Sequence, residues 1–246
     1  CCIADIADMG SKMLVITDND PDLAHRTAEE LGMAFYEIRG QQSQYLDIDT
    51  ALNQAQEKAA KGEKGIQLLE WSDLAGGGGP TDGTVLLQAM LERGMTNVAA
   101  GIMWDPLAVS ICHDVGAGAE LMLRIGGKVC RLSGTPMDLN VVVERVYKEA
   151  VITTRQQGDT NLGAAAVVRC GETELILVSK RALGYGLKAF RELGVEPDDK
   201  QYLLLKHFVD DDHINVWGSS SDIKTWPATG IIRPKWPWDE NPFDSV

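Results

Sequence analysis

The stretch IQLLEWSDLAGGGGPTDGTVLLQAMLERGMTNVAAGIMW, residues 66–104, decides the fold of this chain. It begins with a short apolar run at 66–70 and passes through a glycine-rich segment at 71–82. Apolar residues then recur at helical spacing over 82–93, and a second apolar run follows at 98–104. This order of strand, loop, helix and strand predicts an α/β fold, a mixed sheet with packed helices.

The sequence after residue 104 continues the same pattern. Asp105 and Pro106 are suited to the N-cap and first position of a helix from 106 to about 115. We expect strands at 120–127, 164–170, 174–179 and 202–206, and a short helix at 187–193. The β-branched stretch 137–154 predicts either one long strand or a bent pair. Residues 66–246 are therefore expected to form one complete domain.

Residues 1–65 are predicted to be a partial α/β segment, the C-terminal remnant of an upstream domain. Residues 13–17 (MLVIT) favour a strand, and 49–60 favour a helix. A helix is also expected after Asp20-Pro21, with one buried apolar stripe. The residues of that stripe are Leu23, Thr27, Leu31, Phe35 and Ile38. The polar stretch 61–64 marks the boundary, and the first residue is not Met, so we expect a fragment of a longer chain.

Composition excludes several classes of function. Of the 246 residues, 44% are hydrophobic and 24% charged, which is typical of a folded globular protein. The net charge of −13 argues against nucleic acids and anionic membranes as partners, because both are negatively charged. No apolar run approaches the length of about 20 residues that a transmembrane helix needs. The five cysteines lack paired spacing, which favours free thiols in the cytoplasm.

The glycine run is the most specific local motif. Backbone N–H groups between a strand and a helix can bind an anion, but the run ends in Gly-Pro-Thr-Asp and matches no nucleotide fingerprint. Asp82 is expected to cap the helix that follows. Two interpretations stay open for the run, the lip of a binding site or a tight turn between packed elements.

Other polar residues carry weaker signals. His207 and His213 bracket three aspartates, a set that could bind a divalent metal, although the spacing fits no ligand rule and a solvated turn is the alternative. Asp105 could serve as a helix cap or as a carboxylate at the carboxyl edge of the sheet. Lys128 follows two glycines and is expected to be solvated.

Four motifs together resemble the microcystinase C-like (MlrC-like) metallopeptidase family. They are D-x-x-G-G-G-x-P-x-D at 73–82, W-D-P at 104–106, G-x-G followed by L-x-x-G-G-K between 116 and 128, and R-P-x-W-P-x-D at 233–239. Each motif is weak alone, but they stand in family order. Residues 67–240 resemble the C-terminal domain of the family, and 1–65 the end of its N-terminal domain. Leu74 departs from the family pattern, which has Asn there.

The resemblance implies a metal-dependent hydrolase of peptide or amide bonds, with zinc as its metal and a small peptide or amide as substrate. The named member of the family cleaves linear peptides in microcystin degradation. The zinc ligands of the family lie in its N-terminal domain, so we expect them upstream of this chain, which would be inactive alone. The missing N-terminal domain is the expected partner. Because the glycine loop follows a strand, we expect it to face the cleft, with substrate-binding or metal-supporting roles for Asp73, Gly76, Gly77, Gly78 and Asp82.

Two alternatives remain. One is a non-catalytic α/β binding or assembly module, in which the glycine run is only a turn. The other is an enzyme with its own metal at His207, Asp210–Asp212 and His213. The oligomeric state, including a homo-oligomer, stays open.

Overall fold

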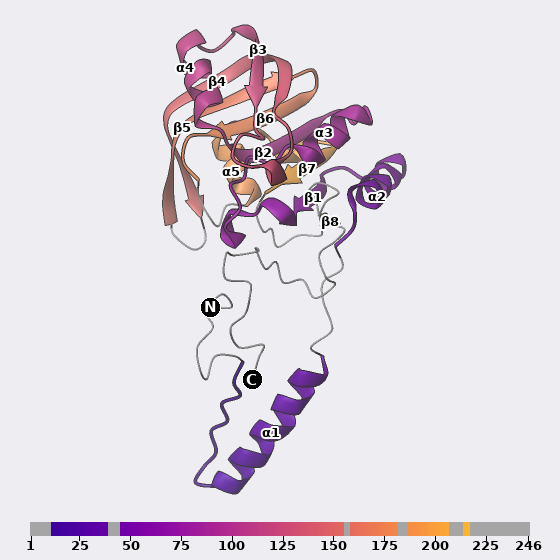
Figure 1. Cartoon of the computed structure of the whole chain (residues 1–246), viewed down its shortest axis with the longest axis vertical. Helices are drawn as coiled ribbons and strands as arrows, with labels where there is room; N and C mark the ends of the chain where they lie inside the picture. The colour runs from indigo at the N-terminus through magenta and orange to yellow at the C-terminus, as the bar shows by residue number, and fades with distance from the viewer. Residues whose placement is uncertain (1–10, 39–44, 155–157, 182–185, 207–213, 217–246) are drawn as a thin grey trace, which may run out of the picture. The chain divides into compact units, whose positions relative to one another are not determined.

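A computed structural model describes residues 11–38, 45–154, 158–181, 186–206 and 214–216 (Figure 1). The chain divides into two compact units, Cys1–Gln44 and Tyr45–Val246. The larger unit contains every strand of the described residues and the motifs at 73–128. The tail motif at 233–239 lies outside the described residues, as do His207 and His213.

The first unit contains helix α1, Pro21–Glu37. Asp20 caps it as predicted, because its Oδ1 accepts a hydrogen bond from the Leu23 backbone N–H at 2.9 Å. The expected buried stripe is wrong, since Leu31 and Phe35 are each 50% exposed and no residue of α1 is buried. The strand expected at 13–17 is also wrong, because these residues belong to no described strand and Leu14 is 86% exposed.

The larger unit is built on one eight-stranded mixed sheet, in the order β3-β4-β5-β6-β2-β7-β1-β8. Strands β6, β2, β7, β1 and β8 are parallel, and β3, β4 and β5 extend the sheet as antiparallel neighbours. The strand bounds are β1 Ile66–Glu70, β2 Val98–Trp104, β3 Glu120–Ile125, β4 Met137–Thr154, β5 Gly158–Cys170, β6 Thr173–Val178, β7 Tyr202–Leu205 and β8 Ile214–Val216. The predicted mixed α/β sheet is confirmed, and 137–154 forms one long strand.

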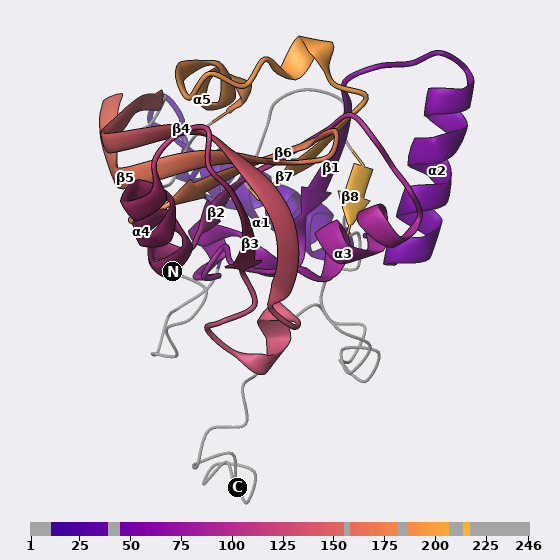
Figure 2. The same cartoon turned by 90° about the horizontal axis from the view of Figure 1, so that it is seen from above.

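Helices cover both faces of the sheet (Figure 2). Three helices, α2 (Ile48–Ala60), α3 (Val85–Glu92) and α4 (Pro106–Val115), bury apolar side chains in one hydrophobic cluster with β1 and β2. Helix α5 (Leu187–Glu192) lies on the opposite face, where Phe190 packs in a second cluster with Leu69 and Ile102. None of the described helices is both long and apolar enough to cross a bilayer.

Helix α2 packs against the sheet of the larger unit. Its side chains Ala51, Leu52 and Ala55 are fully buried and share a cluster with Ile66 and Leu68 of β1. The compact unit therefore starts at Tyr45, ahead of the residue where we expected the complete domain to begin. The expected boundary at residue 65 divides the chain by the domain of a longer protein to which each part belongs, and it stays a prediction.

Candidate functional site

The carboxyl ends of the parallel strands bring polar side chains to one edge of the sheet. Glu70 is the last residue of β1, Lys206 directly follows β7, and Asp105 directly follows β2. Strand β7 pairs with both β1 and β2, so these three ends are neighbours. Ligands of open α/β sheets bind outside this edge, which makes it the place to look for a site.

The glycine-rich loop wraps around the carboxylate of Asp73. A short 3-10 helix, Trp71–Asp73, buries this side chain beneath the loop. Asp73 Oδ1 accepts a hydrogen bond from Thr81 N, and Oδ2 accepts one from Gly83 N, both at 2.7 Å. The loop N–H groups that could have bound an external anion are therefore used by a carboxylate of the chain itself.

Close approach explains why some of these glycines are needed. A Cβ on Gly79 would lie 2.8 Å from the Asp73 carbonyl carbon, and one on Gly83 would lie 2.8 Å from Asp73 Oδ2. Gly76, Gly77 and Gly78 instead lie at the exposed tip of the loop, where an added Cβ would meet nothing within 4 Å. The glycine run therefore combines a tightly packed base with an open tip.

Lys206 is a fully buried ammonium between two carboxylates. Its Nζ donates to Glu70 Oε2 at 2.5 Å and to Asp73 Oδ2 at 3.0 Å. Glu70 is 1% exposed and Lys206 0% exposed, so these charges are almost without solvent. Buried charges are found in proteins when they are paired and hydrogen-bonded, and both conditions hold here.

Burial and charge act in opposite directions on this network. Burial lowers the pKa of Lys206, but attraction by Glu70 and Asp73 outweighs it, so the Lys206 pKa lies above its ordinary value and the amine stays protonated. Burial raises the pKa of Glu70, Lys206 pulls it down, and Asp73 raises it again, with a net increase. The ammonium therefore offsets part of the effect of burial on the pKa of Glu70.

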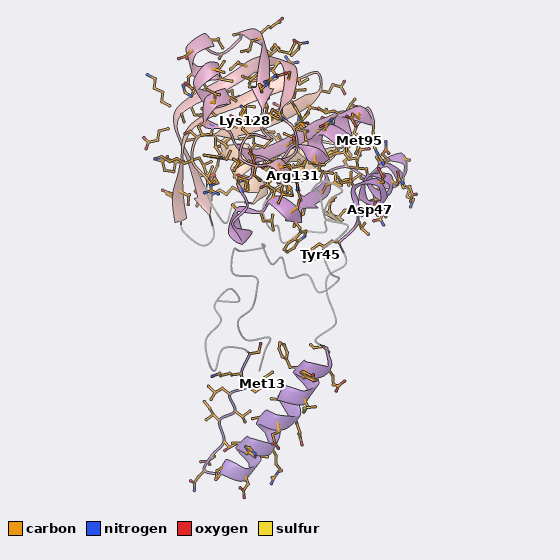
Figure 3. All side chains as sticks on the ribbon, in the orientation of Figure 1. Met13, Tyr45, Asp47, Met95, Lys128 and Arg131 are labelled. Carbon is orange, nitrogen blue, oxygen red and sulfur yellow. The ribbon has the colours of Figure 1, made fainter. Side chains whose placement is uncertain are left out.

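A second pair of a carboxylate and an ammonium, Asp105 and Lys128, lies at the end of β2. Asp105 caps α4 as predicted, accepting from Ala108 N at 3.1 Å, and also accepts from Gly126 N at 2.8 Å. Lys128, labelled in Figure 3, is an exposed residue, in line with the expectation that it is solvated, but its ammonium has partners within the chain. Its Nζ donates to both oxygens of Asp105, at 2.8 and 2.7 Å, and to the Arg124 carbonyl at 2.7 Å.

Asp82 does not cap α3, so that prediction is wrong. The helix begins at Val85 after Thr84, without a side-chain cap. The Asp82 Oδ2 instead accepts hydrogen bonds from Lys128 N at 2.7 Å and Val129 N at 2.9 Å, which ties the glycine loop to the turn after β3. Asp82 Oδ1 is buried and accepts no hydrogen bond from the described residues.

A cavity of about 280 Å³ opens beside these carboxylates. Its lining combines the polar residues just described with apolar side chains and glycine backbone: Asp82, Trp104, Asp105, Pro106, Leu107, Gly126, Lys128 and Val129. The Arg181 guanidinium carbon lies 5.6 Å from the centre of the Trp104 ring, and Arg181 Nη1 donates to the Gly79 carbonyl at 3.3 Å. The glycine loop, the W-D-P motif and the G-G-K turn therefore meet around one hollow.

Backbone strain marks the same place. Thr81 is β-branched and buried, yet its φ is +64°, a region that side chains of this kind rarely adopt. Its N–H binds Asp73, and its carbonyl accepts from Trp104 N at 3.1 Å. Strain of this kind persists where the surroundings fix the backbone, often at a functional site.

The described residues do not form a metal site. No group of three or more histidine, cysteine, aspartate or glutamate side chains among them could hold a metal ion. Glu70 and Asp73 do share a cation, but it is the Lys206 ammonium, whose Nζ contacts both carboxylates. We therefore derive no catalytic step through zinc from these residues.

Comparison with known proteins places the chain in a family. A family model described as MlrC C-terminus matches residues 68–210, which is more than half of the chain. Microcystinase C of Sphingomonas sp. is 34% identical over 210 residues, covering 82% of this chain and 40% of that protein. The chain belongs to the MlrC family. The resemblance inferred from the four motifs is thereby confirmed, and the chain spans about 40% of the length of its curated relative.

A solved structure supports the fold of this MlrC-family chain. It is a Mesorhizobium sp. BNC1 protein provisionally described as a metallopeptidase, with a TM-score of 0.62 and 20% identity. The match covers 75% of this chain and 37% of the other. At this identity the likeness confirms the α/β architecture alone.

Sequence reasoning missed part of the site. Asp73 and Asp82 were predicted, and the structure places both in buried networks at the same edge. Glu70, Lys206 and Arg181 were not predicted as site residues, since a charged residue at the end of a strand is usually solvated. Their positions could have indicated a site, because Glu70 and Lys206 each stand at the end of a predicted strand.

Proposed function

We propose that this chain is the C-terminal part of a metal-dependent peptide or amide hydrolase that uses zinc. Its relation to Microcystinase C and to a provisionally described metallopeptidase supports a peptidase-type activity. In this proposal residues 1–65 are the end of the N-terminal domain and residues 66–246 are the C-terminal domain. The zinc ligands belong to the N-terminal domain, which is the partner of this chain, and the isolated chain is inactive.

The role we assign to this chain is to form one wall of the substrate cleft. The observation that carries this role is the meeting of Asp82 and Asp105 at the cavity, each held by hydrogen bonds to backbone N–H groups. An Asp82 that merely capped a helix far from any cavity would have argued against the proposal; instead, Asp82 lines one. Rigid polar groups beside a hollow can orient a substrate without taking part in bond cleavage.

The open tip of the glycine loop extends this wall. Gly76, Gly77 and Gly78 carry no side chains and are exposed, so a substrate backbone can lie close to theirs. The base of the same loop is fixed by Asp73 and Lys206. We therefore assign Gly76–Gly78 to substrate binding and Asp73 to positioning.

The proposal includes a substrate class and a cellular location. A small peptide or amide substrate agrees with the names of the relatives and with a negatively charged protein that disfavours nucleic acids. The described cysteines Cys112, Cys130 and Cys170 are free, which supports the reducing cytoplasm.

The proposal is tested by comparing two proteins, the 246-residue chain and the product of the complete reading frame that encodes it. We expect the complete product to contain stoichiometric zinc and to hydrolyse a linear peptide, with activity lost on chelation. We expect neither zinc nor hydrolysis for the chain alone. Zinc-dependent hydrolysis by the chain alone would contradict the proposal and favour the His207–His213 segment as the metal site. An inactive, metal-free complete product would favour a non-catalytic binding module.

A further inference from the structure

Among the buried side-chain oxygens of the described residues that line the cavity with Trp104 and Val129, Asp82 Oδ1 has no hydrogen-bond partner. The Lys128 ammonium makes contacts with both Asp105 oxygens and with the Arg124 carbonyl, so its donors are taken. The Asp105 oxygens also accept from Ala108 N and Gly126 N. Asp82 Oδ2 accepts from two backbone N–H groups, but Asp82 Oδ1 is buried without a partner among the described residues.

A buried carboxylate oxygen that accepts no hydrogen bond has lost its hydration without compensation, which is unfavourable. No described residue donates to this oxygen, so it is free to accept a hydrogen bond from a ligand. An anion is excluded as the ligand, because it would face this carboxylate with no free cationic donor on Lys128.

The rest of the cavity is suited to an apolar group. Trp104, Pro106, Leu107 and Val129 contribute apolar surface, and Leu107 and Val129 remain 60% and 49% exposed. At about 280 Å³ the cavity is slightly smaller than the roughly 300–1,000 Å³ of typical ligand pockets. It is therefore sized for one amino-acid residue rather than for a nucleotide or a large cofactor.

We propose that this cavity is a subsite for one apolar residue of a peptide, whose N–H group donates a hydrogen bond to Asp82 Oδ1. The inference rests on the proposed function for its substrate class, and it adds the position and the recognition chemistry. The donor is either a terminal ammonium or an internal amide, and both share the N–H that Asp82 requires. Leu107 and Val129 contact the apolar side chain at the mouth of the cavity.

Binding of three small probes to the 246-residue chain tests the subsite without requiring hydrolysis. The probes are leucinamide, N-acetyl-leucinamide, and N-acetyl-N-methyl-leucine dimethylamide, which has no N–H group. Titrations are followed by NMR at the backbone amides of Gly126, Lys128 and Val129. We expect at least one N–H probe to shift these signals, and the probe without N–H to bind about 10-fold to 150-fold more weakly. Comparison of the first two probes distinguishes the ammonium from the amide.

Variants connect the binding to the named residues. Asp82→Asn can keep one oxygen on the Lys128 and Val129 N–H groups and turns the other position into a donor, so binding should fall at least about tenfold. Leu107→Ala should weaken the binding of the leucine probes. It should have little effect on the stability of the fold, because the Leu107 side chain is 60% exposed. Asp114→Asn, the same change on the exposed end of α4, is the matched control and should leave binding unchanged.

Three results would overturn the subsite: no shifts at these amides, equal affinity for the probe without N–H, or normal binding by a folded Asp82→Asn variant. Thermal unfolding of each variant verifies that it is folded. If Asp82→Asn fails to fold, Leu107→Ala and the probe without N–H still decide the question. Probe binding in a protein whose complete product hydrolyses no peptide would leave the subsite standing and remove the proposed function.

Discussion

Replacing Lys206 with methionine should loosen the whole glycine loop. The variant removes the ammonium that contacts Glu70 and Asp73 and leaves two carboxylates in a region where Lys206 and Glu70 are 0% and 1% exposed. Each lost hydrogen bond to a charged group is worth about 1.5–3 kcal/mol. Asp73 keeps its bonds from Thr81 N and Gly83 N, so Glu70 carries most of the penalty. The expected loss of unfolding free energy is about 3–5 kcal/mol.

The loss should depend on pH in a defined direction. The pKa of Glu70 already lies above its ordinary value of 4.5 because of burial, and removing Lys206 removes the group that lowers it. A carboxyl group whose pKa is raised on folding stabilises the fold when protonated and loses that stabilisation as pH rises through the folded pKa. The destabilisation by Lys206→Met should therefore be greatest near neutral pH and shrink as the pH falls toward 4.5.

Urea unfolding and native-state hydrogen exchange measure the two parts of this prediction. Urea unfolding gives the free-energy loss, and exchange at the Thr81 and Gly83 amides reports the loop itself. The double variant Lys206→Met/Glu70→Gln should recover part of the loss, because it removes the unpaired charge. Lys188→Met, which removes an exposed lysine paired with the partly buried Glu192, is the control and should cost at most about 0.5 kcal/mol. A loss below about 1 kcal/mol, or one that grows at low pH, would refute this account of the network.

Three further substitutions or reactions test other parts of the structure. Gly79→Ala places a Cβ 2.8 Å from the Asp73 backbone and should lower the free energy of urea unfolding by about 1–3 kcal/mol. In the control Gly76→Ala the added Cβ meets nothing within 4 Å, so the unfolding free energy should change by less than about 0.5 kcal/mol. Equal effects of the two variants would contradict the tightly packed base of the glycine loop. Lys128→Met removes the ammonium from buried Asp105 and should lower the unfolding free energy by about 1.5–3 kcal/mol. Arg124→Met breaks the exposed pair with Asp138 and should lower it by less than about 1 kcal/mol. The reverse order would count against a stabilising role of the Lys128–Asp105 pair. Burial raises the pKa of the Cys112 thiol to about 11, whereas Cys130 is exposed. Peptide mapping after iodoacetamide treatment near neutral pH should therefore find Cys130 labelled well before Cys112. Faster labelling of Cys112 would be inconsistent with its burial.

The sheet could be predicted from local patterns because each element carries its own signal. The apolar run at Ile66–Glu70, the Asp105-Pro106 start of α4 and the Gly171-Glu172 hairpin are all readable within a few residues of sequence. Residues 13–17 show the limit of that method. Their composition favours a strand, but a strand forms only against a hydrogen-bonding neighbour, and the sequence does not tell whether one is present.

The site was harder to predict because it depends on contacts between distant segments. Asp82 stands where a helix cap is expected, yet its Oδ2 binds Lys128 N and Val129 N, from a turn that only the folded sheet brings near. Lys206 is buried because β7 lies beside β1, which places its ammonium at Glu70. Neither pairing has a local signature, so sequence motifs located the site but not its hydrogen bonds.

The most direct test of the central claim is kcat/KM for a linear peptide, measured on the product of the complete reading frame with and without Asp82→Asn. The claim that the carboxyl edge of this sheet forms part of the substrate cleft predicts at least about a tenfold loss for Asp82→Asn and none for Asp114→Asn. Equal kcat/KM for a folded Asp82→Asn variant and the parent would contradict it.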